Sequence, residues 1–162
     1  MSPDCDDKAR FSALMTTYAG PVRRLCAAYA QGAADREDLF QDIFLAVWRA
    51  LPAFRHEASE RTWLYRIAHN VALTSQARAR RRQSRETILD EDRHPTTEMD
   101  LRRVALRRAI AAMAPGDRTL VLLWLEGLSA VEIEEVTGVK APTVSVRLSR
   151  LRRQLAPIEV QR

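Results

Sequence analysis

The chain has few of the residues that break helices or build other kinds of scaffold. Its 162 residues include five glycines, seven prolines and two cysteines, and no run of alternating β-branched residues marks a strand. Cys5 and Cys26 form no CxxC or Cys/His cluster, which argues against a disulfide framework or a zinc site. No uninterrupted apolar run approaches the roughly 20 residues of a membrane helix. These absences predict an all-α protein with no metal site and no membrane insertion.

The sequence also lacks the signals of export and of catalysis. Its first residues, MSPDCDDKARFS, have neither the basic nor the apolar segment of a secretory signal, so we expect a cytoplasmic protein with free thiols and with Cys26 in a core. His56, His69 and His94 form no HxxxH or HExxH pattern, and no phosphate-binding glycine loop or Ser/His/Asp set is visible. We therefore expect neither an enzyme nor a cofactor.

Arginine dominates the cations that are present. Only Lys8 and Lys140 among the 26 basic residues are lysines, and the net charge is +5. Residues 1–85 hold 14 basic and 9 acidic residues, whereas residues 86–162 hold 12 of each. Because a guanidinium donates two hydrogen bonds at once to a phosphate, this composition favours a nucleic-acid partner.

Apolar periodicity predicts three helices in the first part of the chain. The first covers roughly 8–31, and Gly20-Pro21 is expected to kink or divide it. The second is expected to start with Asp35 as its cap and to end near Leu51. The third runs from about residue 60 to 85.

Residues 86–100 separate these helices from a second helical region. The segment carries six acidic residues and one arginine and has no core of its own, which predicts an extended flexible linker. The helical period returns at Leu101 and continues to about Met113. A turn and helix cap are expected at residues 115–117, before a helix that ends at Gly127. We thus expect two small helical domains, 1–85 and 101–162.

Residues 128–155 have the pattern of a helix-turn-helix. Ser129 and Glu132 form a capping box, with Leu128 and Ile133 as a hydrophobic staple, and Gly138 supplies the turn to the next helix. That helix has an apolar stripe at Val144, Leu148, Leu151 and Leu155. Its other face carries Thr143, Ser145, Val146, Arg147, Ser149, Arg150, Arg152 and Arg153. In a helix-turn-helix this second helix enters the major groove, although an ordinary helical hairpin with a solvated cationic face has the same pattern.

Three segments together resemble a known family. They are DREDLFQDIFLAVWRAL at 35–51, FRHEASERTWLYRIAHNVA at 54–72 and LSAVEIEEVTGVKAPTVSVRLSRLRRQL at 128–155. In order and spacing they are similar to the two domains of bacterial sigma factors of the extracytoplasmic-function class. The resemblance implies an alternative sigma factor that binds core RNA polymerase, recognises the minus-thirty-five promoter element with its C-terminal domain, and recognises and opens the minus-ten element with its N-terminal domain. It also implies an anti-sigma protein as a partner.

The resemblance gives a role to one polar helix face. Asp38, Gln41 and Asp42 lie at i, i+3 and i+4 and share a face opposite the apolar stripe. A solvated polar face has the same spacing. In the family the matching face binds the polymerase clamp helices, so the resemblance implies that these three residues bind core polymerase.

A second group is suited to unpaired bases of the minus-ten element. Trp63, Arg66 and Asn70 offer a stacking plane, a cation and an amide, with Tyr65 as a further plane, although Trp63 fits a core position equally well. The resemblance implies that the loop before this helix forms a pocket for a flipped base, with walls from Phe54, Arg55, His56 and Glu57. A small residue, often glycine, usually stands in the family where this chain has His56.

The remaining predicted contacts are to duplex DNA. By their place in the helix-turn-helix, we expect base contacts in the minus-thirty-five element from Thr143, Ser145, Val146, Arg147, Ser149 and Arg150. Phosphate contacts are expected from Arg78, Arg80, Arg81, Arg82, Arg152 and Arg153; a solvated helix end is the other interpretation of the arginine run at 78–85. The alternative function is a free-standing helix-turn-helix repressor or activator in which residues 1–85 sense a signal or dimerise.

Overall fold

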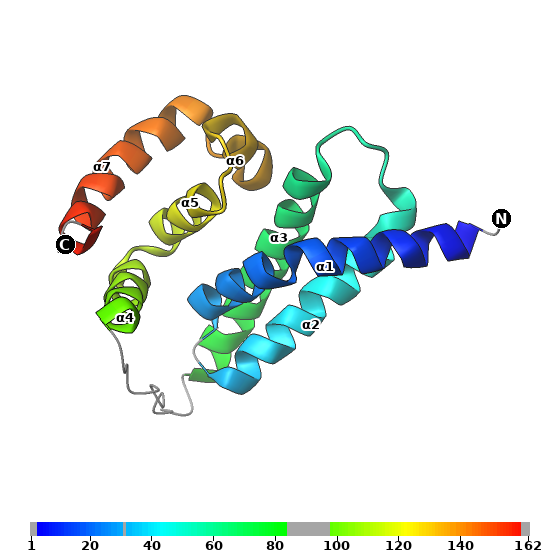
Figure 1. Cartoon of the computed structure of the whole chain (residues 1–162), viewed down its shortest axis with the longest axis horizontal. Coiled ribbons are helices and arrows are strands. Elements are labelled where there is room, and N and C mark those ends of the chain that lie inside the picture. The colour runs from blue at the N-terminus through cyan, green and yellow to red at the C-terminus, as the bar shows by residue number, and fades with distance from the viewer. Residues whose placement is uncertain (1–2, 31, 84–97, 160–162) are drawn as a thin grey trace. The chain divides into compact units, whose positions relative to one another are not determined.

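A computed structural model describes residues 3–30, 32–83 and 98–159, and these residues form seven α-helices, one short 3-10 helix and no strand (Figure 1). The chain divides into two compact units, residues 1–89 and 90–162. None of the described helices is long and apolar enough to cross a membrane. The predicted all-α fold is confirmed.

The first unit is a three-helix bundle. It consists of α1 (Pro3–Tyr29), α2 (Ala33–Ala50) and α3 (Glu60–Gln83), with the 3-10 helix η1 (Leu51–Ala53) after α2. Both α1 and α3 pack against α2 (Figure 1). The core combines aliphatic and aromatic side chains from all three helices, including Leu14, Val22, Leu25, Leu39, Phe40, Ile43, Phe44, Val47, Leu64 and Tyr65.

Two details of this unit differ from the prediction. Of the two outcomes expected at Gly20-Pro21, a kink or a division of the helix, the division does not occur, because α1 continues through Pro21. A proline inside a helix destabilises it by about 3 kcal/mol or more, whereas burial of one large apolar side chain stabilises the fold by roughly 1.5–3 kcal/mol. The nearby Val22 and Leu25 are both buried, so their burial offsets the cost of the proline. Asp35 does not cap α2: the cap is Gly32, and Asp35 lies in the first turn, where its charge still suits the helix dipole.

Cys26 lies in the core of the first unit as a free thiol, as predicted. Its burial raises the pKa of the thiol to about 12, so the group stays protonated and unreactive at neutral pH. The side chain of Cys5 falls outside the described residues.

The second unit contains four helices, three of which pack around α7. These are α4 (Glu98–Ala112), α5 (Pro115–Leu125), α6 (Ala130–Thr137) and α7 (Ala141–Glu159), and α7 packs against the other three. Its first helix begins earlier than predicted, since α4 starts at Glu98 rather than at Leu101. The core is formed mainly by Ile110, Leu120, Val121, Leu123, Ile133, Val136, Val144, Leu148, Leu151 and Leu155.

Local signals define the α6–α7 pair as predicted. The Ser129 N–H donates to Glu132 Oε2 at 2.8 Å, and the Glu132 N–H donates to Ser129 Oγ at 3.3 Å. Gly138 ends α6 in the left-handed conformation, at φ 75°. The apolar stripe of α7 is buried throughout. The predicted cap at residues 115–117 is wrong in one respect: Ala114 precedes α5 without a side-chain cap, and the Asp117 carboxylate is used elsewhere.

Candidate nucleic-acid interface

The outward face of α7 presents hydroxyls, one apolar side chain and arginines. Thr143, Ser145, Ser149 and Arg150 are exposed, and Val146 is 73% exposed in spite of its apolar side chain. Ser145 Oγ donates to the Ala141 carbonyl at 3.0 Å, which leaves its lone pairs available. This mixture can donate to and accept from base edges and can contact a thymine methyl.

Arg147 departs from the expected arrangement because it is not simply an outward cation. Its Nε and Nη2 groups donate to Asp117 Oδ1 at 2.9 and 2.6 Å, and Arg150 Nη2 lies 3.4 Å from Asp117 Oδ2. An acid therefore lies beside this face, although the outward residues 143–153 of α7 include none. The acid comes from α5, thirty positions earlier in the chain, where the periodicity of α7 gives no sign of it.

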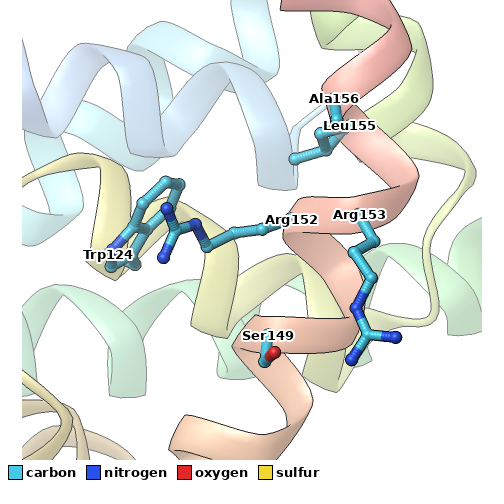
Figure 2. Close-up of a pocket in the computed structure, with 6 residues that line it drawn as sticks. All are labelled: Trp124, Ser149, Arg152, Arg153, Leu155 and Ala156. Carbon is cyan, nitrogen blue, oxygen red and sulfur yellow. The ribbon is translucent and has the colours of Figure 1, made fainter.

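Arg152 and Arg153 leave α7 in different directions. Figure 2 shows the Arg152 guanidinium beside the indole of Trp124, whereas the Arg153 side chain extends away from it. The Arg152 Cζ atom is 5.1 Å from the ring centroid, a cation–π distance. Both arginines line a shallow cavity of about 350 Å³ with Trp124, Ser149, Leu155 and Ala156 (Figure 2). Both remain exposed, as phosphate contacts require.

Three rings meet at the loop before α3. The Phe54 ring lies 4.6 Å from His56 and 4.6 Å from Trp63, measured between centroids. Arg10 of α1 covers the same phenyl ring, with its Cζ atom 4.9 Å from the centroid. Phe54 and Trp63 are half-buried, so Trp63 belongs neither wholly to the core nor wholly to the surface.

Arg10 also contacts the polar residues of this loop, a role that sequence reasoning missed. Its Nη2 group lies 3.2 Å from His56 Nε2 and 2.7 Å from Glu60 Oε1. Because arginine has only donors, His56 Nε2 is the acceptor of this bond. His56 adopts φ 57°, a left-handed conformation that glycine adopts most easily. The family that the sequence resembles often has glycine at this position, and the left-handed conformation is a physical reason for that preference.

The other predicted minus-ten residues are spread along the loop and α3. Arg55, Glu57, Arg66 and Asn70 are exposed. Tyr65 is only 1% exposed and packs at 6.5 Å against Tyr18. Its expected role as a stacking plane is therefore wrong, because it lies on the core side of α3.

The polar face of α2 is open to solvent as the spacing predicts. Asp38, Gln41 and Asp42 are all exposed. Gln41 Nε2 donates weakly to Glu37 Oε1 at 3.4 Å, and the hydrogen bond from Arg23 lowers the pKa of Glu37. Leu45, which sequence reasoning missed, lies on the same face and is 46% exposed. Leu45 follows Asp38 by seven residues, which is two turns along one helix face. This spacing could have predicted its place on the polar face.

The arginine run at the end of α3 is described only in part. Arg78 is exposed. The side chains of Arg80, Arg81 and Arg82 fall outside the described residues, so their predicted phosphate contacts stay predictions.

Comparison with known proteins agrees with the order of these surfaces along the chain. The family model of Sigma-70 region 2 matches residues 14–85, and that of Sigma-70 region 4 matches residues 103–155. The chain is 30% identical to the ECF RNA polymerase sigma-E factor of Haemophilus influenzae, over 92% of this chain and 87% of that protein. It is 28% identical to the ECF RNA polymerase sigma factor SigM of Mycobacterium tuberculosis, over 93% of this chain and 77% of that protein.

Solved structures share the fold at lower identity. The sigma factor RpoE in its complex with the anti-sigma factor NepR from Bartonella quintana aligns with a TM-score of 0.74 and 21% identity, over 94% of this chain and 99% of that one. CnrH in complex with the cytosolic domain of CnrY aligns with a TM-score of 0.70 and 21% identity, over 93% and 88%. The chain belongs to the extracytoplasmic-function class of RNA polymerase sigma factors, alternative sigma factors that direct promoter-specific initiation of transcription.

Proposed function

We propose that the exposed face of α2 binds core RNA polymerase through Asp38, Gln41 and Asp42, with Leu45 beside them. The three polar side chains are exposed, while Leu39 and Ile43 on the other side of the helix are buried. The face therefore has no part in folding the bundle. Carboxylates around an exposed leucine suit a partner surface that combines basic and apolar side chains.

The loop before α3 and the exposed side of α3 bind the unpaired minus-ten strand. Phe54, His56 and Trp63 supply ring faces at the loop, and base stacking on aromatic rings contributes roughly 1–3 kcal/mol per base. Asn70 carries an amide that can read a base edge. Further contacts come from the exposed side chains of Arg55, Glu57 and Arg66.

The outward face of α7 reads the minus-thirty-five element in the major groove. The base-contacting group is Thr143, Ser145, Val146, Arg147, Ser149 and Arg150. Arg152 and Arg153, farther along the same helix, hold the phosphate backbone, and on α3 the exposed Arg78 does so together with Arg80, Arg81 and Arg82. Phosphate contacts fix the register of the helix on the duplex, while the base contacts supply the specificity.

The partners of the chain are core polymerase, promoter DNA and an anti-sigma protein. RpoE and CnrH, which share its fold, were solved with the anti-sigma factor NepR and with the cytosolic domain of CnrY. The chain acts in the cytoplasm, where polymerase and DNA meet. It contributes binding energy to initiation and performs no catalysis of its own.

The observation that carries this proposal is the exposed acidic face of α2, because a free-standing repressor needs the α7 face alone. Run-off transcription with core polymerase and genomic promoter fragments tests it. We expect discrete transcripts that require both the chain and core enzyme. A chain that binds the same fragments but neither supports transcription nor co-migrates with core polymerase would be a repressor or activator instead.

A further inference from the structure

We infer that Asp117 is a specificity-determining residue that positions Arg147 to recognise a guanine in the upstream promoter element. The inference rests on the proposed role of α7 in reading that element. It adds a residue of α5 to the recognition surface, which otherwise consists of side chains of α7.

The geometry of the Arg147–Asp117 pair leaves one end of the guanidinium available. Both bonds to Asp117 Oδ1 come from the same edge of the group, from Nε at 2.9 Å and from Nη2 at 2.6 Å. A guanidinium has five N–H donors in a planar fork. The outer donors on Nη1 and Nη2 therefore remain as a second fork, pointing away from Asp117. Two parallel donors of this kind match the O6 and N7 acceptors of guanine in the major groove.

The pair is sheltered enough to hold this orientation before DNA arrives. The side chain of Asp117 is 15% exposed and that of Arg147 is 31% exposed, whereas Arg150 is 62% exposed. Gly116 leaves the space that the guanidinium occupies, because a Cβ atom at this position would lie 3.3 Å from Arg147 Nη2. A long side chain that is already fixed loses less rotamer freedom on binding. Fixing the fork in one plane also favours the base whose acceptors match that plane.

The Asp117 carboxylate binds Arg147 more closely than it binds Arg150. Its contact with Arg150 is a single 3.4 Å approach of Oδ2, so Arg150 keeps its freedom to reach phosphate or base. Asp117 thus reduces the positive charge of the face by one unit while it orders only Arg147. If neutralisation were its whole effect, removal of the charge would raise affinity for every DNA sequence. If it positions Arg147, removal lowers the preference for one base at one position.

Selection from a promoter library separates these two effects. Holoenzyme assembled from core polymerase and the full-length chain is incubated with duplexes randomised across the upstream element, and the retained DNA is sequenced. We expect the wild-type chain to enrich guanine at one position, and Asp117→Asn to reduce that enrichment by about tenfold, which corresponds to about 1.4 kcal/mol. Total retention of DNA should stay equal or rise because a negative charge has been removed.

Matched variants show whether the effect passes through Arg147. Glu126→Gln removes a carboxylate from the residue that follows the other end of the same helix and should leave the selected sequence unchanged. Arg147→Ala should abolish the guanine preference, and adding Asp117→Asn to it should change the selected sequence no further. Circular dichroism of the full chain should give the same helicity for every variant.

Several results would overturn the inference. An unchanged guanine preference in Asp117→Asn, or an equal loss of retention for all sequences, would make Asp117 a neutralising or merely structural residue. Independent effects of the two substitutions would show that Asp117 does not act through Arg147. If the wild-type holoenzyme selects no sequence at all, the proposed function of α7 is refuted, and the inference with it. If the wild type selects a guanine and Asp117→Asn keeps that preference, only the inference is refuted.

Discussion

Arg10, in the first helix of the chain, donates two hydrogen bonds to Glu60 Oε1 at the start of α3, from Nε at 3.0 Å and from Nη2 at 2.7 Å. The bond joins residues fifty positions apart and closes the loop that carries the proposed base-binding pocket. Since the same guanidinium contacts His56 and covers Phe54, one side chain contacts two residues of that site and the helix start beside it.

Replacement of Arg10 should therefore affect promoter opening more than stability. The side chains of Arg10 and Glu60 are 26% and 42% exposed, and ion pairs of this kind contribute at most about 1 kcal/mol. We expect the free energy of unfolding of Arg10→Ala to lie within about 1 kcal/mol of the wild-type value. The permanganate reactivity of thymines in the minus-ten element should fall severalfold. Lys8→Ala, which removes a positive charge from the same helix, is the control. Equal opening by both variants would show that the loop needs no support from Arg10.

Asn70 should be needed for capture of unpaired bases and not for binding of duplex DNA. We expect Asn70→Ala to leave closed-complex formation by holoenzyme nearly intact and to reduce permanganate reactivity in the minus-ten element, because base capture supplies the free energy for unstacking. Changes in Phe54 should act in the same way. Parallel losses of closed-complex formation and opening would point to a damaged fold instead.

Arg150 and Arg147 should both be needed for recognition of the upstream element. Alanine at either position should weaken binding of the holoenzyme to its own promoter by roughly 1–3 kcal/mol if the lost contact is a bidentate one to guanine. Arg153→Ala, a phosphate contact in this account, should weaken binding similarly for all sequences and reduce its salt dependence. Full activity of both Arg147→Ala and Arg150→Ala on their own promoter would remove these residues from the recognition surface.

His69 should make the first unit sensitive to mild acid. The residue is 8% exposed, its Nδ1 atom lies 3.5 Å from Tyr29 Oη, and burial lowers the pKa of its imidazole. The unfolded state, with a histidine pKa near about 6.5, therefore binds the proton more tightly. Above about pH 6.5 the free energy of unfolding should not depend on this group. As the pH is lowered from about 6.5 to the folded-state pKa, the free energy of unfolding should decrease by at most about 1.4 kcal/mol per pH unit for one proton.

The pH dependence can be measured by urea unfolding between pH 7.5 and 5. Tryptophan fluorescence in a Trp124→Phe background reports the first unit, which then holds the remaining tryptophans Trp48 and Trp63. His69→Gln should flatten the slope between pH 6.5 and 5. An unchanged slope would assign the acid sensitivity to other groups.

The sequence predicts those parts of the structure that depend on neighbouring residues. The capping box of Ser129 and Glu132, the turn at Gly138 and the buried stripe of α7 each follow from spacings of a few residues, and all are confirmed. The polar face of Asp38, Gln41 and Asp42 follows from helix geometry in the same way. Periodicity also predicts the all-α fold.

Contacts between distant segments could not be predicted in this way. The spacing of Tyr65 allows either side of α3, and the packing of α1 decides that it is buried. Asp117 follows Pro115-Gly116, a local pattern typical of a turn and cap, but the approach of α7 gives its carboxylate to Arg147 instead. The Arg10–Glu60 pair likewise depends on how α1 meets α3. Local patterns therefore indicate the elements and their faces, while tertiary packing selects the partners.

In the proposed function, the α2 face holds the chain on core polymerase. Asp38→Arg combined with Asp42→Arg reverses two exposed charges, and exposed substitutions of this kind usually change stability by about 0.5 kcal/mol or less. If the face meets basic residues, the reversal places like charges together, at a cost of several kcal/mol to binding. Asp6→Arg combined with Glu135→Arg makes the same change in net charge at exposed sites outside α2.

Whether the α2 face binds core polymerase can be measured by capture of core enzyme on the immobilised full-length chain, with circular dichroism to verify equal helicity. We expect wild type and the control variant to retain core polymerase and the Asp38→Arg/Asp42→Arg variant to lose it. Undiminished capture by that variant, folded as well as wild type, would contradict the assignment of the α2 face.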